Sequence, residues 1–164
     1  MPVVMGILNV TPDSFSDGGQ YQSTASAIAK AHQMIEEGAE IIDIGGESSR
    51  PGAEPLGLQE ELDRVLPVIE ALKDCGVALS IDTYKSKTMK AALDAGIDIL
   101  NDIWAFRQPH ALEVAASSSQ VGLCVMHMQK DPATMQFDPE YDNVVDDVNG
   151  FLMERVVDLE EAGI

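Results

Sequence analysis

The stretch DAGIDILN, Asp94 to Asn101, shows the pattern that decides the fold. It places a glycine just past a segment of helical period and continues as an apolar run rich in isoleucine and leucine. Glycine supplies the left-handed residue that ends a helix, and short apolar runs of this kind are typical of buried strands. The stretches EEGAEIIDI (36–44) and DCGVALSI (74–81) repeat the pattern. We therefore predict helices that each lead directly into a buried strand.

Outward from these stretches, five apolar segments alternate with five segments of helical period along the whole chain. The predicted strands are 3–10, 40–46, 77–83, 98–104 and 121–128. The predicted helices are 23–38, 57–76, 86–96, 110–119 and 143–163. A strand and a helix repeated five times imply parallel strands, buried on both faces, with helical crossovers.

Two α/β architectures share this order of elements. A (β/α)8 TIM barrel uses about 31 residues per unit, so 164 residues correspond to about five βα units. The alternative is a five-stranded doubly wound open sheet. The last residues, EEAGI (160–164), repeat the helix-ending glycine, which favours an interrupted barrel. We expect a single domain over 1–164 that lacks strands six to eight and their helices.

The composition restricts the class of partner. The chain has 10 Lys plus Arg against 28 Asp plus Glu, a net charge of −18, which argues against nucleic acid or an anionic membrane. No apolar run approaches the roughly 18 residues that span a bilayer, and no basic leader precedes one.

Cys75 and Cys124 form no CxxC motif, so we read them as reduced thiols of a cytoplasmic protein.

Polar residues gather at the predicted carboxyl ends of the strands, where ligands bind in either architecture. Alternation puts Ser80 and Asp82 on one face of their strand, and an inward carboxylate needs a donor or stays protonated. Asp82 beside Asn101 suits a flat heterocycle with amide and amidine edges. The structural alternatives are an Asp82 that caps the next helix and an Asn101 that holds its own loop.

Two further strand ends carry candidate ligand contacts. Arg50 follows two serines and precedes a Pro-Gly turn, so it is a candidate contact for a phosphate group. The alternative is that Arg50 forms a surface salt bridge. Met126 offers a thioether that can pack on a flat ring.

These residues stand in motifs that resemble those of the dihydropteroate synthase family, in the same order and spacing over essentially the whole chain. The motifs are MGILNVTPDSFSDGG (5–19), IIDIGGESSRPGA (41–53), SIDTYK (80–85), NDIW (101–104) and VMHM (125–128). The resemblance implies a (β/α)8 barrel of folate biosynthesis and a sulfonamide target. It also implies a transferase that joins 6-hydroxymethyl-7,8-dihydropterin pyrophosphate to 4-aminobenzoate and releases pyrophosphate.

The resemblance also implies roles for individual residues. Asp82 and Asn101 resemble the ligands of the pterin edge, and Met126 resembles part of the pterin pocket wall. Asn9 resembles the residue that helps to bind Mg²⁺ beside the pyrophosphate.

The remaining implied roles belong to two loops. Ser49 and Arg50 resemble the pyrophosphate contacts, although most relatives have Thr where Ser49 stands. Phe15 and Pro51 are expected to wall the aminobenzoate pocket, and Ser14 is counted with the substrate contacts. Catalysis is expected to depend on Asp82, Asn101 and Arg50.

Parts of the family pattern are absent from these 164 residues. They include most of the N-terminal hairpin, an Asp-Pro-Gly motif after a sixth strand, a later pterin-contacting Lys, and a final Arg and His. The family homodimer contacts are mostly absent too. We therefore expect these residues alone to lack synthase activity. The alternatives are a non-catalytic pterin-binding fragment and a pterin-dependent methyltransferase barrel.

Overall fold

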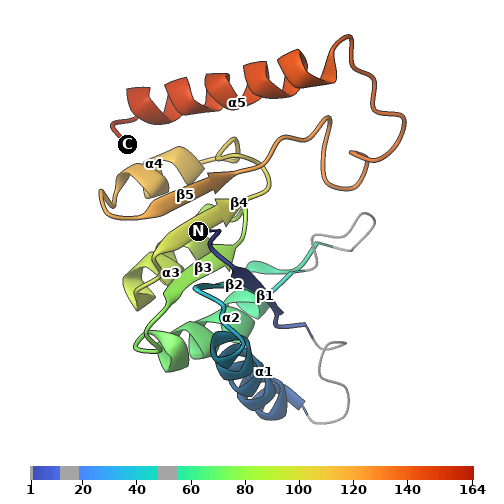
Figure 1. Cartoon of the computed structure of the whole chain (residues 1–164). Coiled ribbons are helices and arrows are strands. Elements are labelled where there is room, and N and C mark those ends of the chain that lie inside the picture. The colour runs from blue at the N-terminus through green and yellow to red at the C-terminus, as the bar shows by residue number, and fades with distance from the viewer. Residues whose placement is uncertain (1, 12–18, 48–54) are drawn as a thin grey trace.

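Strands and helices alternate strictly along the chain (Figure 1). The computed structural model describes residues 2–11, 19–47 and 55–164. The strands are β1 (Met5–Asn9), β2 (Ile41–Gly45), β3 (Ala78–Asp82), β4 (Ile99–Asp102) and β5 (Gly122–Val125). The helices are α1 (Gly19–Glu36), α2 (Leu58–Leu72), α3 (Ser86–Ala95), α4 (Ala111–Ala116) and α5 (Val144–Glu161). All five predicted strand–helix units are confirmed, with strands shorter than predicted.

The order of the strands distinguishes the two predicted architectures. All four strand pairs are parallel, and the strands follow one another as β1-β2-β3-β4-β5. Figure 1 shows this order as the colour change from blue to orange across the sheet. A doubly wound sheet reverses direction at a switch point, whereas a (β/α) barrel adds each strand to the same side. The doubly wound alternative is therefore wrong.

The register separates the sheet into an apolar face and a polar face. The apolar face carries a row of paired residues: Leu8, Ile44, Ile81, Leu100 and Leu123. The first four are at most 2% exposed and belong to the hydrophobic core. Because strand side chains alternate, the neighbouring residues project from the other face. The candidate polar residues lie on that second face.

The helix-ending glycines adopt the predicted conformation. Gly96 ends α3 with a φ of 100°, and its N–H points to the carbonyls of Ala92 and Leu93. Gly38 and Gly76 have φ angles of 105° and 87°. The glycine signals at Gly38 and Gly96 are therefore confirmed as left-handed helix ends, whereas Gly76 is left-handed but lies four residues beyond the end of α2 at Leu72.

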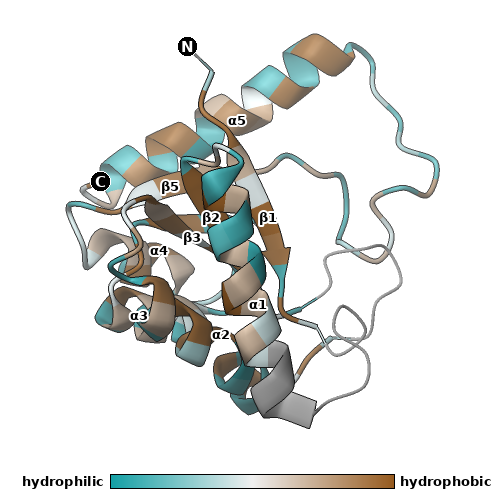
Figure 2. Cartoon of the chain, turned by 60° about the horizontal axis from the view of Figure 1, so that its bottom comes forward, coloured by the Kyte–Doolittle hydropathy of each residue, from teal (hydrophilic) through white to brown (hydrophobic). Residues whose placement is uncertain are grey.

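The first four helices form a layer that covers the apolar face. Contacts run from α1 to α2, from α2 to α3 and from α3 to α4. Figure 2 shows brown, apolar strands beneath α1, whose ribbon alternates between teal and brown. In the part of the chain that the structure describes, no helix is long and apolar enough to cross a membrane.

Helix α5 differs from the other long helices because none of its residues is buried. Its apolar spacing predicts one packed face, yet Val145 is 70% exposed and Val156 is 38% exposed. Phe151 makes the aromatic contact of this helix with the sheet end, through an edge-on packing against His127. The apolar stripe of α5 is therefore only partly covered by the described residues.

Candidate functional site

Five residues of the polar face form one row at the carboxyl ends of the strands. In strand order, the row consists of Asn9, Gly45, Asp82, Asn101 and Cys124. Gly45 leaves a gap between Asn9 and Asp82, because a Cβ there would lie 3.5 Å from Asn9 Oδ1 and 3.7 Å from Asp82 Oδ2. The row therefore lies where parallel α/β folds bind ligands, and it offers acceptor oxygens on both sides of a gap.

Asp82 is the acid at the centre of this row. Burial is the main cause that raises its pKa from 3.8 to about 7, and nearby carboxylates add to the rise. These carboxylates belong to Asp43, Asp102, Glu61 and Glu47. No hydrogen bond between described residues links Asp82 to the first turn of α3, so the alternative role as a helix cap is not supported. Asp82 is a carboxyl group whose charge needs a partner.

The side chain of Asn101, on β4, is held by a residue of β2, two strands away in the sheet. Its Nδ2 donates a 3.0 Å hydrogen bond to Oδ2 of Asp43, which lies on β2 and is only 4% exposed. The other oxygen of that carboxylate, Oδ1, is buried without a hydrogen-bond partner among the described residues. Asn101 and Asp43 are thus a part-buried pair beside Asp82.

The turn after β4 is held by Asp102 and not by Asn101. Asp102 is fully buried and accepts 2.8 Å hydrogen bonds from the backbone N–H groups of Trp104 and Phe106. Burial raises its pKa to about 6, although these two bonds and the charge of Arg107 oppose the rise. The alternative in which Asn101 holds its own loop is therefore wrong, and its side chain is available to the site.

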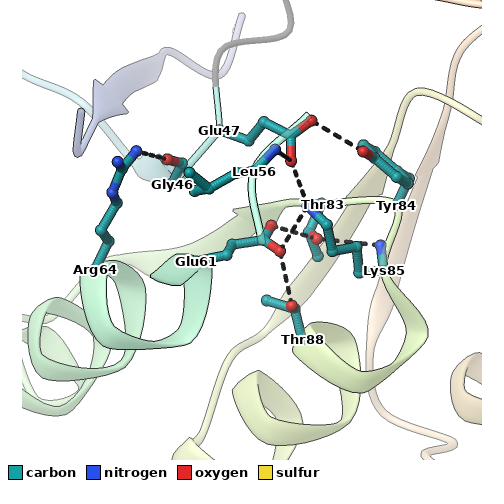
Figure 3. Close-up of polar contacts among 9 residues, drawn as sticks. All are labelled: Gly46, Glu47, Leu56, Glu61, Arg64, Thr83, Tyr84, Lys85 and Thr88. Atoms are coloured by element: carbon teal, nitrogen blue, oxygen red, sulfur yellow. Dashed lines mark hydrogen bonds and ion pairs between the residues drawn. The ribbon is translucent and has the colours of Figure 1, made fainter. Parts of the chain in front are cut away.

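A second polar cluster fixes the ends of the segment between β2 and α2 (Figure 3). Glu47 Oε1 accepts a 2.9 Å hydrogen bond from the Tyr84 hydroxyl, and Oε2 accepts one of 3.1 Å from the Leu56 N–H. Lys85 Nζ also bonds Glu47 Oε2. On the α2 side, Arg64 donates 2.8 Å to the Gly46 carbonyl. Both ends of the segment are tied to neighbouring elements.

The centre of this cluster is Glu61, a carboxylate of α2 that is 1% exposed. It accepts hydrogen bonds from the hydroxyls of Thr83 (2.7 Å) and Thr88 (2.9 Å), and Lys85 Nζ lies 3.0 Å away. Burial alone would lower the pKa of Lys85, but the bonds and charges of Glu47 and Glu61 outweigh it and the net direction is upward. Lys85 is thus a fixed cation between two acids.

The charge distribution limits what the row can bind. Burial raises the pKa of Asp82 and the surrounding acids raise it further, while Lys85 is paired with Glu47 and Glu61. The acceptor groups beside the gap at Gly45 are side-chain oxygens of Asn9 and Asp82. Such a site favours N–H donors or developing positive charge and disfavours an anion at the same point.

The structure brings together some of the predicted site residues. Asn9, Asp82 and Asn101 share the row, and Asn9 is exposed. Met126 follows β5 directly and is half-buried, so it lies at the same end of the sheet. The predicted loop residues lie outside the described residues: Ser14, Phe15, Ser49, Arg50 and Pro51.

The metal prediction concerns Asn9. Among the residues that the structure describes, no three His, Cys, Asp or Glu side chains are grouped as metal ligands. A single amide oxygen fits only a cation that takes its other ligands from water and substrate, as Mg²⁺ often does. Asn9 Oδ1 beside the Gly45 gap meets that condition.

Sequence reasoning missed two acids of this site. Asp43 lies between the buried Ile42 and Ile44, and the alternation that located Asp82 would have placed it on the polar face. Glu61 lies four residues before Val65 on the buried side of α2, a spacing that marks a carboxylate inside the protein.

Known proteins are similar to this chain in sequence and in fold. The family profile described as pterin binding enzyme matches residues 5–164. A dihydropteroate synthase of Haemophilus influenzae is 50% identical over 167 residues, which cover 100% of this chain and 60% of that protein. The chain thus spans about 60% of the length of this curated relative.

Solved structures give the same result. The Burkholderia cenocepacia dihydropteroate synthase complexed with 7,8-dihydropteroate is 50% identical, with a TM-score of 0.89 over 100% of this chain and 55% of that one. The Xanthomonas albilineans dihydropteroate synthase with 4-aminobenzoic acid is 49% identical, with a TM-score of 0.90 over 99% of this chain and 57% of that one.

Proposed function

The chain belongs to the family of pterin binding enzymes, and from that premise we propose that the full-length protein carrying it is active as a dihydropteroate synthase. It would join 6-hydroxymethyl-7,8-dihydropterin pyrophosphate to 4-aminobenzoate and release pyrophosphate. The observation that carries the proposal is the Asp82–Asn101 pair, in register at the strand ends, with the pKa of Asp82 raised to about 7. The solved relatives bound to 7,8-dihydropteroate and to 4-aminobenzoic acid support it.

The polar row suits the pterin half of this reaction. Asp82 and Asn101 offer oxygens to the N–H groups of a pterin ring, and Met126 would pack on its face. When pyrophosphate leaves, positive charge develops on the pterin methylene. The acidic surroundings of Asp82 would stabilise that charge without a covalent enzyme intermediate.

The pyrophosphate half is assigned to the rim of the site. Asn9 Oδ1 would be a ligand of Mg²⁺, whose other ligands would be water and pyrophosphate oxygens. Bound there, the cation would neutralise charge on the leaving group. Ser49 and Arg50 would contact the pyrophosphate, and Ser14, Phe15 and Pro51 would contact the substrates from their loops.

The proposal extends to the cellular location and the oligomeric state of the protein. Cys75 and Cys124 are free thiols, which suits a reducing compartment, and we expect a cytoplasmic protein. Assembly as a homodimer stays a prediction from the resemblance.

Turnover of the two substrates by the full-length protein tests the proposal. We expect dihydropteroate and pyrophosphate to form in equal amounts, and Asp82→Asn to lower kcat/KM by about 100-fold or more. Asp74→Asn is the matched control, because Asp74 is exposed in the turn after α2. Absence of product from the wild type, or equal rates for Asp82→Asn and wild type, would contradict the proposal.

A further inference from the structure

We propose that Asp43 is the positioning residue of this site: it fixes the side-chain amide of Asn101 in one orientation, with the carbonyl oxygen turned toward the ligand. The inference rests on the proposed function, because it assigns how the pterin edge is read. It adds a residue that does not belong to the polar row. Asp43 acts through Asn101.

The geometry of the pair spans three strands. Asp43 is on β2 and Asn101 is on β4, so their 3.0 Å hydrogen bond passes over β3. The residue of β3 in register with Asp43 is Ser80, whose side chain is short. A small residue at that place leaves space for the bond to cross. The two side chains meet although 58 residues separate them in sequence.

Chemistry decides which end of the amide faces Asp43. An ionised carboxylate only accepts hydrogen bonds, and of the two ends of a carboxamide only the NH₂ group donates. The Nδ2 end of Asn101 must therefore point to Asp43. Because the amide is planar, this bond fixes Oδ1 on the opposite side. Without it, a carboxamide can exchange its donor and acceptor ends by a rotation about one bond.

Burial of Asp43 shows that this bond is not incidental. Its side chain is 4% exposed, and it lies in the acidic surroundings of Asp82. A carboxylate in such a place opposes folding unless its hydrogen bonds compensate. Among the described residues, the carboxylate of Asp43 accepts its side-chain hydrogen bond from Asn101 at Oδ2, while Oδ1 finds no donor. The carboxylate is therefore better explained by the orientation of Asn101 than by stability.

The consequence is a fixed pattern of recognition. Oδ1 of Asn101 and the carboxylate of Asp82 both present acceptors from neighbouring strands. A ring with an exocyclic amine at this edge is complementary to them, whereas a ring with a carbonyl oxygen there places acceptor against acceptor. The site should discriminate between pterins and lumazines, which differ in that group.

The test measures binding of 6-hydroxymethylpterin and 6-hydroxymethyllumazine to the full-length protein by fluorescence titration. Asp43→Asn keeps the shape of the side chain, but the new carboxamide can donate as well as accept a hydrogen bond. The orientation of the Asn101 amide is then no longer fixed. We expect this variant to bind the pterin about 10-fold more weakly than wild type. The ratio of the lumazine Kd to the pterin Kd should fall by about 10-fold.

An exchange variant makes the test specific. Asn101→Asp places two carboxylates against each other and should bind the pterin at least about 10-fold more weakly. Combining it with Asp43→Asn restores one donor and one acceptor, keeps the net charge, and again turns a carboxylate oxygen toward the ligand. The exchanged pair should recover the affinity to within about 5-fold of wild type.

The controls separate positioning from folding. Ser80→Ala removes a buried side-chain oxygen beside Asp43 but leaves the Asp43–Asn101 bond, so it should bind within about 3-fold of wild type. An equal loss in Ser80→Ala and Asp43→Asn would assign the effect to disturbed packing and overturn the inference. If Asp43→Asn alone does not fold, the pterin affinities of Asn101→Asp and of the exchanged pair are compared instead. Tighter binding by the exchanged pair supports the role of Asp43.

Failure of this inference can be distinguished from failure of the proposed function. A wild type that binds pterin, with an exchanged pair no better than either single variant, overturns the role of Asp43 alone. A wild type that neither binds the pterin nor forms dihydropteroate overturns both.

Discussion

At the scale of single residues, Asp82 is the most informative position in the chain. Burial and four neighbouring acids raise its pKa to about 7, and no described residue donates a hydrogen bond to it. A group in such surroundings opposes folding once it ionises, and groups of this kind gather at functional sites. The position is therefore explained by what it binds.

The raised pKa of Asp82 predicts a pH-dependent stability. The unfolded chain loses this proton near pH 3.8, whereas the folded protein keeps it to about pH 7. The folded state thus binds more protons in this window, and the free energy of unfolding falls as pH rises from about 4 to about 7. At pH 8 the free energy of unfolding of Asp82→Asn should exceed that of wild type by on the order of 2–4 kcal/mol, because the variant has no carboxylate to ionise at this buried place.

Urea unfolding of the full-length protein at pH 4 and pH 8 checks this prediction. The difference between wild type and Asp82→Asn isolates this group from the other acids. Equal differences at the two pH values would show that the Asp82 carboxylate ionises normally in the folded protein.

The sequence predicted part of the site at this scale. Asp82 and Asn101 could be located because strand alternation and the strand ends are both visible in the sequence. The bond from Asn101 to Asp43 could not, since it depends on which strands flank β3. The fixed pairing of Lys85 with Glu61 likewise depends on how α2 meets the loop after β3.

At the scale of elements, the cluster around Glu61 joins α2 to the β3–α3 connection. Glu61 is a buried carboxylate, so its partners decide whether it stabilises the fold. Thr83, Thr88 and Lys85 together supply hydroxyl and ammonium donors. Removing the cation leaves Glu61 buried near Glu47 with two hydroxyl donors but no compensating positive charge.

Replacement of Lys85 by Met should therefore destabilise the protein strongly. We expect a loss of about 3 kcal/mol or more in the free energy of unfolding, measured by chemical denaturation. Lys90→Met is the matched control, because Lys90 pairs with Asp94 on the exposed surface of α3, where such pairs contribute about 0.5 kcal/mol. Equal effects of the two changes would argue against a structural role for the buried cluster.

The glycine at the end of α3 gives a second prediction at this scale. Gly96 has a φ of 100°, where a side chain is strained, so Gly96→Ala should lower stability by about 1–2 kcal/mol. Gly150 lies inside α5 with no neighbouring atom within 4 Å of an added Cβ, so Gly150→Ala should raise it by about 0.5–1 kcal/mol. Thermal unfolding of both variants checks the opposite signs. A shift in the same direction would contradict the assigned conformations.

At the scale of the whole molecule, the five strands have a barrel order but two outer edges. In the described sheet, β1 and β5 each pair on one side only. Val3, just before β1, and Ile7, within β1, are 61% and 64% exposed. Together with the partly covered apolar stripe of α5, these side chains expose a large apolar area for a chain of this size.

The 164 residues expressed by themselves should therefore associate. Open parallel edges and exposed apolar side chains favour contacts between chains. Sedimentation velocity over a range of protein concentrations should show an average mass that rises with concentration. A stable monomer with a cooperative thermal transition would contradict this expectation.

The fold class could be predicted from the sequence, but the choice of architecture could not be made firmly. The glycine-ended helices and the apolar strands gave the element order, and this order is common to barrels and doubly wound sheets. The glycine signal at 160–164 and the family resemblance favoured the barrel, and the pairing of each strand with the next in sequence establishes it. Such pairing is a long-range property that local patterns do not encode.

The central claim is that the polar row at the strand ends holds a pterin. A crystal structure of the full-length protein with 6-hydroxymethylpterin tests it most directly. We expect ring N–H groups about 3 Å from the side-chain oxygens of Asp82 and Asn101. A ring bound elsewhere, or one that turns acceptor atoms toward both residues, would show that the polar row does not bind the pterin edge.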